Sequence, residues 1–184
     1  MKYWFYVFLF LCIPGMLFSA EEDTDSMSQV LLLNSYHPGF KWTDDITLAV
    51  QEAFSPFRTE LHVDYMDTKR HNSPAYINNL KEFYKVKYGG RNFDVIICSD
   101  NYAYEFLSVH RDSVFGRVPV IYCGLNLNDS THLDLSLSDG LTEHVEIYGG
   151  LKSSLEIVPE TKHVYIIYDQ TLTGKEIEKQ VARA

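Results

Sequence analysis

Polar and aromatic residues that could bind a small molecule follow a short apolar run at 29–34. They crowd a loop that leads into an expected helix at Thr43, and the free N–H groups of a helix N-terminus bind anions and carboxylates. Because aromatic faces also pack on apolar groups, we expect a ligand with a carboxylate and an apolar or ring portion, such as an amino acid. The alternative, that Phe40 and Trp42 simply pack over the sheet, stays open. The expected ligand-binding residues of this loop are Ser35, Tyr36, His37 and Trp42.

Each later apolar run is also followed by polar residues. The run at 61–66 leads into a loop with Lys69 and Arg70, whose simpler interpretation is a solvated loop with internal ion pairs. The acid and amide after the run at 93–98 cap a helix well, and capping can coexist with ligand contact. The expected binding residues after the later runs are Asp67, then Ser99, Asp100 and Asn101, then Asn126, and finally Asp169 and Thr173.

The sequence has no motif typical of an enzyme or a metal site. It contains no G-x-G-x-x-G, G-x-x-x-x-G-K-[ST], G-x-S-x-G or H-E-x-x-H, and its seven His include no pair at ligand spacing. A phosphoacceptor receiver domain has the same type of sheet, and Asp100 lies at the right strand end for one. The first strand, however, ends in Asn34 and Ser35, where a receiver would have the acidic pair that holds Mg²⁺. We therefore expect a binding module without a cofactor or metal. A catalytic triad assembled across loops stays an open alternative.

Composition excludes several classes of protein. The 184 residues include 25 acidic and 16 basic side chains, a net charge of −9, which does not suit binding to a nucleic-acid backbone. A hydrophobic share of 46% with 22% charged residues is typical of a globular protein, not of a disordered chain. The length suits a core that needs no disulfide or metal.

The first twenty residues resemble a targeting segment. Lys2 precedes an apolar run at 3–18, which ends in Ser19, Ala20 and an acidic stretch at 21–23. This order predicts a signal peptide, or an uncleaved signal anchor, and a periplasmic or otherwise extracytoplasmic location. The run is shorter than the roughly 20 residues that span a bilayer.

From residue 29 onward, apolar strand-like runs alternate with helical patterns. The expected helices include an apolar face of six residues from Ile46 to Phe57, a helix from Pro74 to Gly89, a short helix after Asp100, a helix at 147–158, and one starting near Thr173. A spacing of about thirty residues predicts βαβ units and an α/β fold with a doubly wound parallel sheet. Ligands of such sheets lie at the carboxyl ends of the strands. The expected strands are 29–34, 61–66, 93–98, 118–123 and 163–168.

The chain divides into two unequal parts. Residues 28–145 form the expected first α/β lobe, and 146–184 the beginning of a second lobe that one strand cannot complete. A polar, weakly patterned stretch at 125–143 separates them, with a hinge expected at 141–146. We expect Cys98 and Cys123 to be buried thiols, with a disulfide between them as the less favoured alternative.

Five segments in chain order resemble the ABC-transporter substrate-binding-protein-like domain, which lies outside the membrane in many bacterial sensor proteins. The resemblance covers 29–181. The family is similar to type I periplasmic binding proteins, which close two Rossmann-like lobes around a small ligand by a hinge. The segments are VLLLNSYHPGFKWTDDI, VDYMDTKR, FDVIICSDNYAYEFL, FGRVPVIYCGLN and IVPETKHVYIIYDQTLTGKEI.

The resemblance implies a receptor rather than a catalyst. Domains of this kind are commonly joined through a membrane helix to histidine kinase or diguanylate cyclase modules, which implies a role in signal transduction, as in two-component systems. The chain would then be held at the membrane by its N-terminal segment or by a span after residue 184. The alternative is a free periplasmic binding protein that delivers solute to an ABC transporter, and a monomer or a dimer fits either. Carried over residue by residue, the implied cleft contains Ser35, Tyr36, His37, Trp42, Asp67, Asp100, Asn101, Asn126, Asp169 and Thr173.

Overall fold

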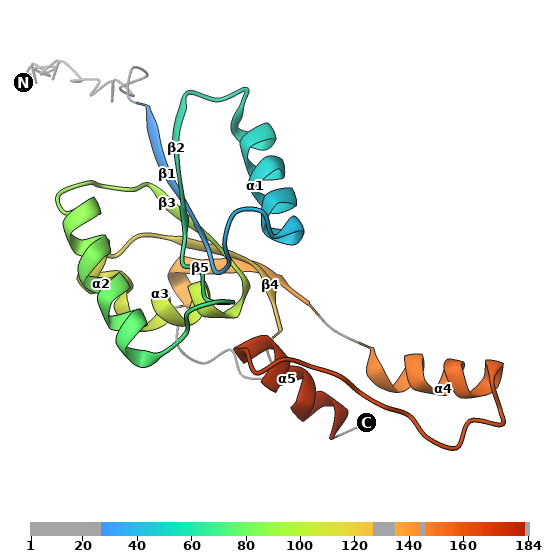
Figure 1. Cartoon of the computed structure of the whole chain (residues 1–184). Coiled ribbons are helices and arrows are strands. Elements are labelled where there is room, and N and C mark those ends of the chain that lie inside the picture. The colour runs from blue at the N-terminus through green and yellow to red at the C-terminus, as the bar shows by residue number, and fades with distance from the viewer. Residues whose placement is uncertain (1–26, 127–134, 144–145, 183–184) are drawn as a thin grey trace, which may run out of the picture.

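The computed structural model describes residues 27–126, 135–143 and 146–182 (Figure 1). A sheet of five parallel strands, in the order β2-β1-β3-β4-β5, forms its centre. This sheet with its helices confirms the predicted doubly wound α/β fold. The strands are β1 (Ser28–Asn34), β2 (Thr59–Tyr65), β3 (Val95–Ser99), β4 (Val120–Leu125) and β5 (Ser138–Thr142). The helices are α1 (Lys41–Phe54), α2 (Pro74–Tyr88), α3 (Asp100–Val114), the 3-10 turn η1 (Leu135–Leu137), α4 (Ile147–Ile157) and α5 (Leu172–Val181).

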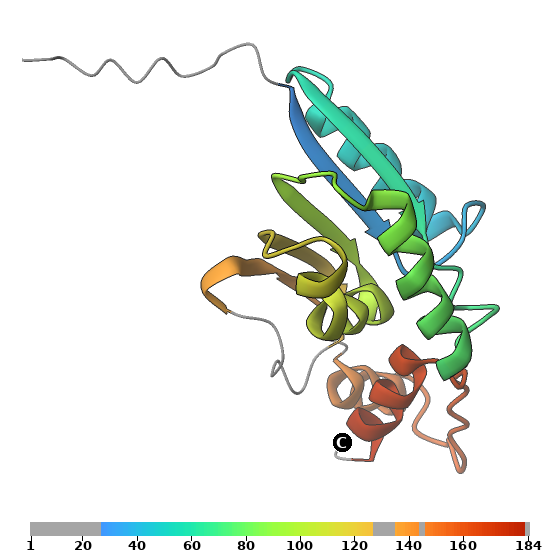
Figure 2. The same ribbon diagram turned by 90° about the vertical axis from the view of Figure 1, so that its left-hand side faces the viewer.

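Apolar side chains cover the sheet on both faces, as the continuous apolar run of β1 predicts. Leu31 and Leu33 enter the larger cluster, which lies beneath α2 and α3 and includes Tyr84 and Phe106. Val30 and Leu32, which alternate with them along β1, lie in a smaller cluster with Val50 and Phe54 of α1. Figure 2 shows α1 on one side of the sheet and α2 on the other.

Helix α1 is buried along a narrower stripe than its apolar pattern predicts. Its buried residues are Thr43 and Thr47, while Ala49, Ala53 and Phe57 of the expected face are exposed. The reason is position: α1 contacts the β1 and β2 side of the sheet, so only a narrow part of its surface is covered.

Helices α2 and α3 begin where the sequence predicts. Ser73 caps α2 by accepting a hydrogen bond from Tyr76 N at 3.3 Å, and Pro74 occupies the first helical position. Helix α3 runs to Val114 and is longer than expected. Its length lets Phe106 and Leu107 reach the core together with Val114.

The prediction of a fifth strand at 163–168 is wrong. This segment is irregular, and Tyr165 and Ile167 are 86% and 95% exposed, because no strand of the described chain lies beside it. The fifth strand is instead β5, inside the stretch that lacks an apolar pattern. An edge strand needs one neighbour only, and β5 pairs with β4 closely enough that a Cβ at Gly140 would collide with the Tyr122 carbonyl.

The segment in which we expect a hinge, 141–146, begins inside the sheet. Leu141 and Thr142 belong to β5, and Glu143 N donates a hydrogen bond of 2.7 Å to Leu125 O, so the first half of this segment is tied to the sheet. Residues 144–145 lie outside the described chain. Helix α4 has no buried residue, whereas α5 packs against α3.

Cys98 and Cys123 are free thiols on opposite faces of the sheet. In the β3–β4 pairing, Cys98 lies beside Tyr122 and Cys123 beside Ser99. Because successive side chains of a strand alternate between faces, this register keeps the two sulfur atoms apart. Burial raises the pKa of both thiols.

Among the residues with described positions, no helix is long and apolar enough to cross a membrane. The expected signal at 1–20 lies outside them.

Candidate functional site

The order of the strands reverses between β1 and β3, and this switch marks one position at the carboxyl edge of the sheet. From β1 the chain passes through α1 to β2 on one side, and from β3 it passes through α3 to β4 on the other. The two helices cover opposite faces, so the ends of β1 and β3, where Asn34 pairs with Ser99, lie at the switch in strand order. Ligands of open α/β sheets bind at this position.

A buried hydrogen-bond network joins these two strand ends. The Ser35 hydroxyl donates to Ser99 O at 2.6 Å and accepts from Ala103 N at 2.8 Å. The Ser99 hydroxyl donates to Asn34 Oδ1 at 2.8 Å, and Asn34 Nδ2 donates to Thr47 Oγ1 at 3.2 Å. Both serines have no exposed surface. Their hydroxyl groups tie β1 to β3 and α3, and the Asn34 amide ties β1 to α1.

Asp100 and Asn101 turn the chain from β3 into α3. Asp100 has a φ of 67°, a left-handed conformation that costs a non-glycine residue on the order of 1 kcal/mol, and its Oδ1 accepts from Asn101 N at 2.6 Å. The Asn101 side chain reaches the end of β4, where its Oδ1 accepts from Asn126 N at 3.1 Å. The structure therefore brings together the residues predicted after the third and fourth strands.

Asn126 is 2% exposed and only half satisfied. Its Nδ2 donates to Glu143 Oε2 at 3.3 Å, but its Oδ1 has no hydrogen-bond partner among the described residues. Sequence reasoning missed Glu143 because the strand before it carries no apolar alternation. A buried acceptor without a partner costs about 1–3 kcal/mol, which suggests a group that completes it in the functional state.

The loop after β2 is held against the end of β1. Thr68 donates two hydrogen bonds to Ser35 O, 2.9 Å from its amide and 2.7 Å from its hydroxyl. Asp67 precedes it with a φ of 54°, and its Oδ1 is buried without a described partner. The other carboxylate oxygen lies 3.6 Å from Arg70 Nη1, so this loop also contains the internal ion pair of the simpler interpretation.

The aromatic loop after β1 packs over the same edge. Tyr36 is 3% exposed, and its ring lies 5.3 Å from that of Phe40 and 6.1 Å from that of Trp42. Trp42 reaches the end of β4, where a Cβ at Gly124 would come within 2.5 Å of its ring. Tyr36 is thus part of the packed core, while His37, Phe40 and Trp42 keep some exposed surface.

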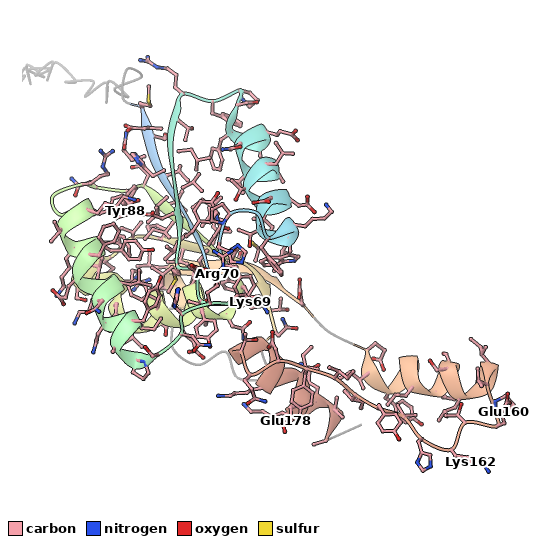
Figure 3. The ribbon with its side chains drawn as sticks, in the orientation of Figure 1. Lys69, Arg70, Tyr88, Glu160, Lys162 and Glu178 are labelled. Carbon is pink, nitrogen blue, oxygen red and sulfur yellow. The ribbon has the colours of Figure 1, made fainter. Side chains whose placement is uncertain are left out.

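The segment before α5 meets this edge from the far end of the chain. Lys69 Nζ lies 2.9 Å from Asp169 Oδ2, which joins loops that are a hundred residues apart. Figure 3 labels Lys69 beside Arg70, at the end of the sheet next to α5. Thr171 caps α5 and also bonds to Asp169. Thr173 lies in α5, but its side chain is outside the described part.

Hydrogen bonds set the ionisation of Asp169. Desolvation acts to raise its pKa, but hydrogen bonds from Thr171 and Lys69 outweigh it, so the pKa of this carboxyl lies below its ordinary value. Asp169 therefore stays an anion through the neutral range.

A cavity of about 710 Å³ lies beside the strand ends rather than on them. Its walls come from α2, α3 and the start of α5, segments whose proximity no local pattern indicates. Burial, followed by the charges of Lys81 and Lys85, lowers the pKa of His110 at its wall. Its lining includes Ile77, Asn78, Tyr102, Phe106, Gln170 and Lys175.

Comparison with family models, curated proteins and solved structures finds no match to this chain. The part of the chain that the structure describes also holds no group of three His, Cys, Asp or Glu side chains that could bind a metal ion.

Proposed function

We propose that this chain is an extracytoplasmic domain that binds a small molecule at the carboxyl edge of its sheet, as the N-terminal sensory part of a transmembrane signalling protein. One observation carries the binding role: loops from four strands converge on this edge, where Asn126 Oδ1 and Asp67 Oδ1 are buried without described partners. The signalling role rests on the resemblance of the five sequence segments.

Backbone conformation supports a binding role at this edge. Both non-glycine residues with positive φ in the described chain, Asp67 and Asp100, lie within two residues of the ends of β2 and β3. Such conformations persist only when the surrounding structure holds them, and they concentrate at ligand sites. Polar groups that would be costly in a closed core become favourable once a ligand pairs with them.

Signalling would proceed by a shift in population. A ligand at the strand ends that binds with different affinities when the segment around Asp169 is near and when it is displaced shifts the balance between these two conformations. A radius of gyration that stays unchanged on ligand saturation, measured by solution scattering, would contradict this change of conformation.

The binding role is tested by a thermal-shift screen with amino acids, small carboxylic acids, sugars and polyamines. A compound that binds the folded state raises the apparent Tm with concentration. We expect Asn126→Ala to remove this increase, because it deletes the unpartnered acceptor. Asn79→Ala, which changes an exposed amide on α2, serves as the matched control and should keep it. A screen in which no compound raises the Tm of the parent protein would contradict the proposal.

A further inference from the structure

Lys69 is a half-enclosed cation whose backbone is fixed at the candidate site. Its side chain is 25% exposed, and the preceding residue, Thr68, is pinned to Ser35 by two hydrogen bonds. The Lys69 ammonium therefore projects from a rigid point at the end of β1 and β2. A fixed cation of this kind loses little entropy when it pairs with an anion.

Aromatic rings border the ammonium group. Lys69 Nζ lies 4.7 Å from the ring centroid of Tyr36 and 5.8 Å from that of Phe40. These rings partly desolvate the charge and favour its place by cation–π attraction. Phe40 and Trp42 keep exposed surface next to it, so an apolar group bound near Lys69 would have rings to contact.

The partner of this ammonium is a carboxylate from a distant segment. Asp169 is 51% exposed, its Oδ2 lies 2.9 Å from Lys69 Nζ, and it is held in place by Thr171. Exposed ion pairs contribute little free energy, so another carboxylate can replace this one at small cost.

We propose that Lys69 recognises a carboxylate on the ligand, and that Asp169 occupies this position as an internal competitor when no ligand is bound. The inference rests on the proposed binding function and adds the residue that recognises the ligand's carboxylate and the internal group that competes with it. Binding would release the Asp169 segment from the loop after β2, so occupancy of the site and the position of the start of α5 are coupled.

The surrounding charges favour a carboxylate over a phosphate. Asp67 and Asp100 stand at the same edge, and their charges oppose a dianion more strongly than a monoanion. A carboxylate also matches the group that Lys69 already binds. The aromatic residues beside it indicate an apolar or aromatic remainder.

The test compares acids with their neutral amides on the intact chain. The probes are phenylacetate and 3-methylbutanoate, with phenylacetamide and 3-methylbutanamide as uncharged counterparts, and affinity is measured by ligand-observed NMR. The variants are Asp169→Asn, which removes the competing charge, and Lys69→Met, which keeps the side-chain stem over the rings. Lys69→Gln replaces Lys69→Met if the latter does not fold.

We expect the parent protein to bind the acids more tightly than the amides. Asp169→Asn should raise acid affinity about twofold to fivefold, the size expected for loss of an exposed ion pair, and should leave amide affinity unchanged. Lys69→Met should lower acid affinity roughly tenfold or more and remove the preference for acids. Equal affinity for acids and amides, or acid affinity that neither substitution changes, overturns the role of Lys69.

The two proposals fail in different ways. If amides, sugars or polyamines bind and the acids do not, the small-molecule site stands and carboxylate recognition by Lys69 falls. If none of these compounds binds the parent protein, both fall.

Discussion

Polar side chains are paired at the amino end of the sheet but only partly paired at its carboxyl end. At the amino end, the side chains pair with one another: Gln29 Nε2 donates to Glu60 Oε2 at 2.8 Å, and Arg91 Nη1 donates to Gln29 Oε1 at 3.0 Å. The carboxyl end holds buried acceptors without described partners on Asp67 and Asn126. The same strands thus end in a satisfied network on one side and an incomplete one on the other. Incomplete pairing in a well-packed region indicates function rather than stability.

The largest expected effect comes from adding one methyl group at each end. Gly124 at the carboxyl end and Gly90 near the amino end have φ values of 71° and 82°, but only Gly124 lies against a side chain, the Trp42 ring. We expect Gly124→Ala to cost about 2–4 kcal/mol of unfolding free energy, and Gly90→Ala about 1 kcal/mol, by urea denaturation. Equal losses would show that the Trp42 contact does not constrain the edge.

The next effect tests whether the serines of the carboxyl edge are structural. Ser35→Ala leaves the buried Ala103 N–H without an acceptor, so we expect a loss of about 1–3 kcal/mol in equilibrium unfolding. Ser113→Ala, on the exposed face of the same α3, should change stability by less than about 0.5 kcal/mol. If the two variants unfold alike, the network between β1 and β3 carries no stability.

Replacing an aspartate by glycine should raise the free energy of unfolding at the carboxyl end of the sheet and lower it at the amino end. Asp67→Gly relieves a left-handed φ and removes a buried unpartnered acceptor, so we expect a gain of up to about 1 kcal/mol. Asp94→Gly, at the amino end, removes an acceptor that receives Gln29 N at 2.8 Å and should cost about 1 kcal/mol. Chemical denaturation measures both, and a loss at Asp67 equal to that at Asp94 would remove the contrast.

The smallest expected effect is the pH dependence of the stability that Asp169 contributes. The pKa of Asp169 is lowered in the folded chain, so its contribution to stability is complete above the unfolded pKa and is lost as pH falls through the folded pKa. The difference in Tm between the parent protein and Asp169→Asn should therefore be constant between about pH 5 and pH 7 and shrink only below that range. A difference that changes with pH inside this range would contradict the pairing with Lys69.

Prediction from sequence succeeded where a residue acts through its neighbours in the chain. Ser73 and Pro74 begin α2 because a cap and a fixed proline φ are local properties, and the apolar run of β1 is buried because hydrophobicity alone demands it. It failed at 163–168, because an apolar run becomes a strand only when another strand lies beside it. It also failed at β5, because an edge strand does not need an apolar pattern.

The candidate site shows the same division. The residues that follow the strands could be selected in advance, because parallel strands share one carboxyl edge. Their roles could not: Ser35 and Ser99 turn inward, Tyr36 belongs to the core, and Lys69 faces aromatic rings rather than only solvent. Glu143 joins Asn126 through a strand that the sequence did not reveal.

By itself, the sequence determined the α/β class, the parallel direction of the strands and the loops that gather at one edge, because hydrophobic periodicity and capping depend on residues close in the chain. Only the tertiary structure decided which polar atoms at that edge are satisfied and which remain unpaired. Pairing depends on distances between segments far apart in the sequence, such as Lys69 and Asp169, and those distances are set by packing.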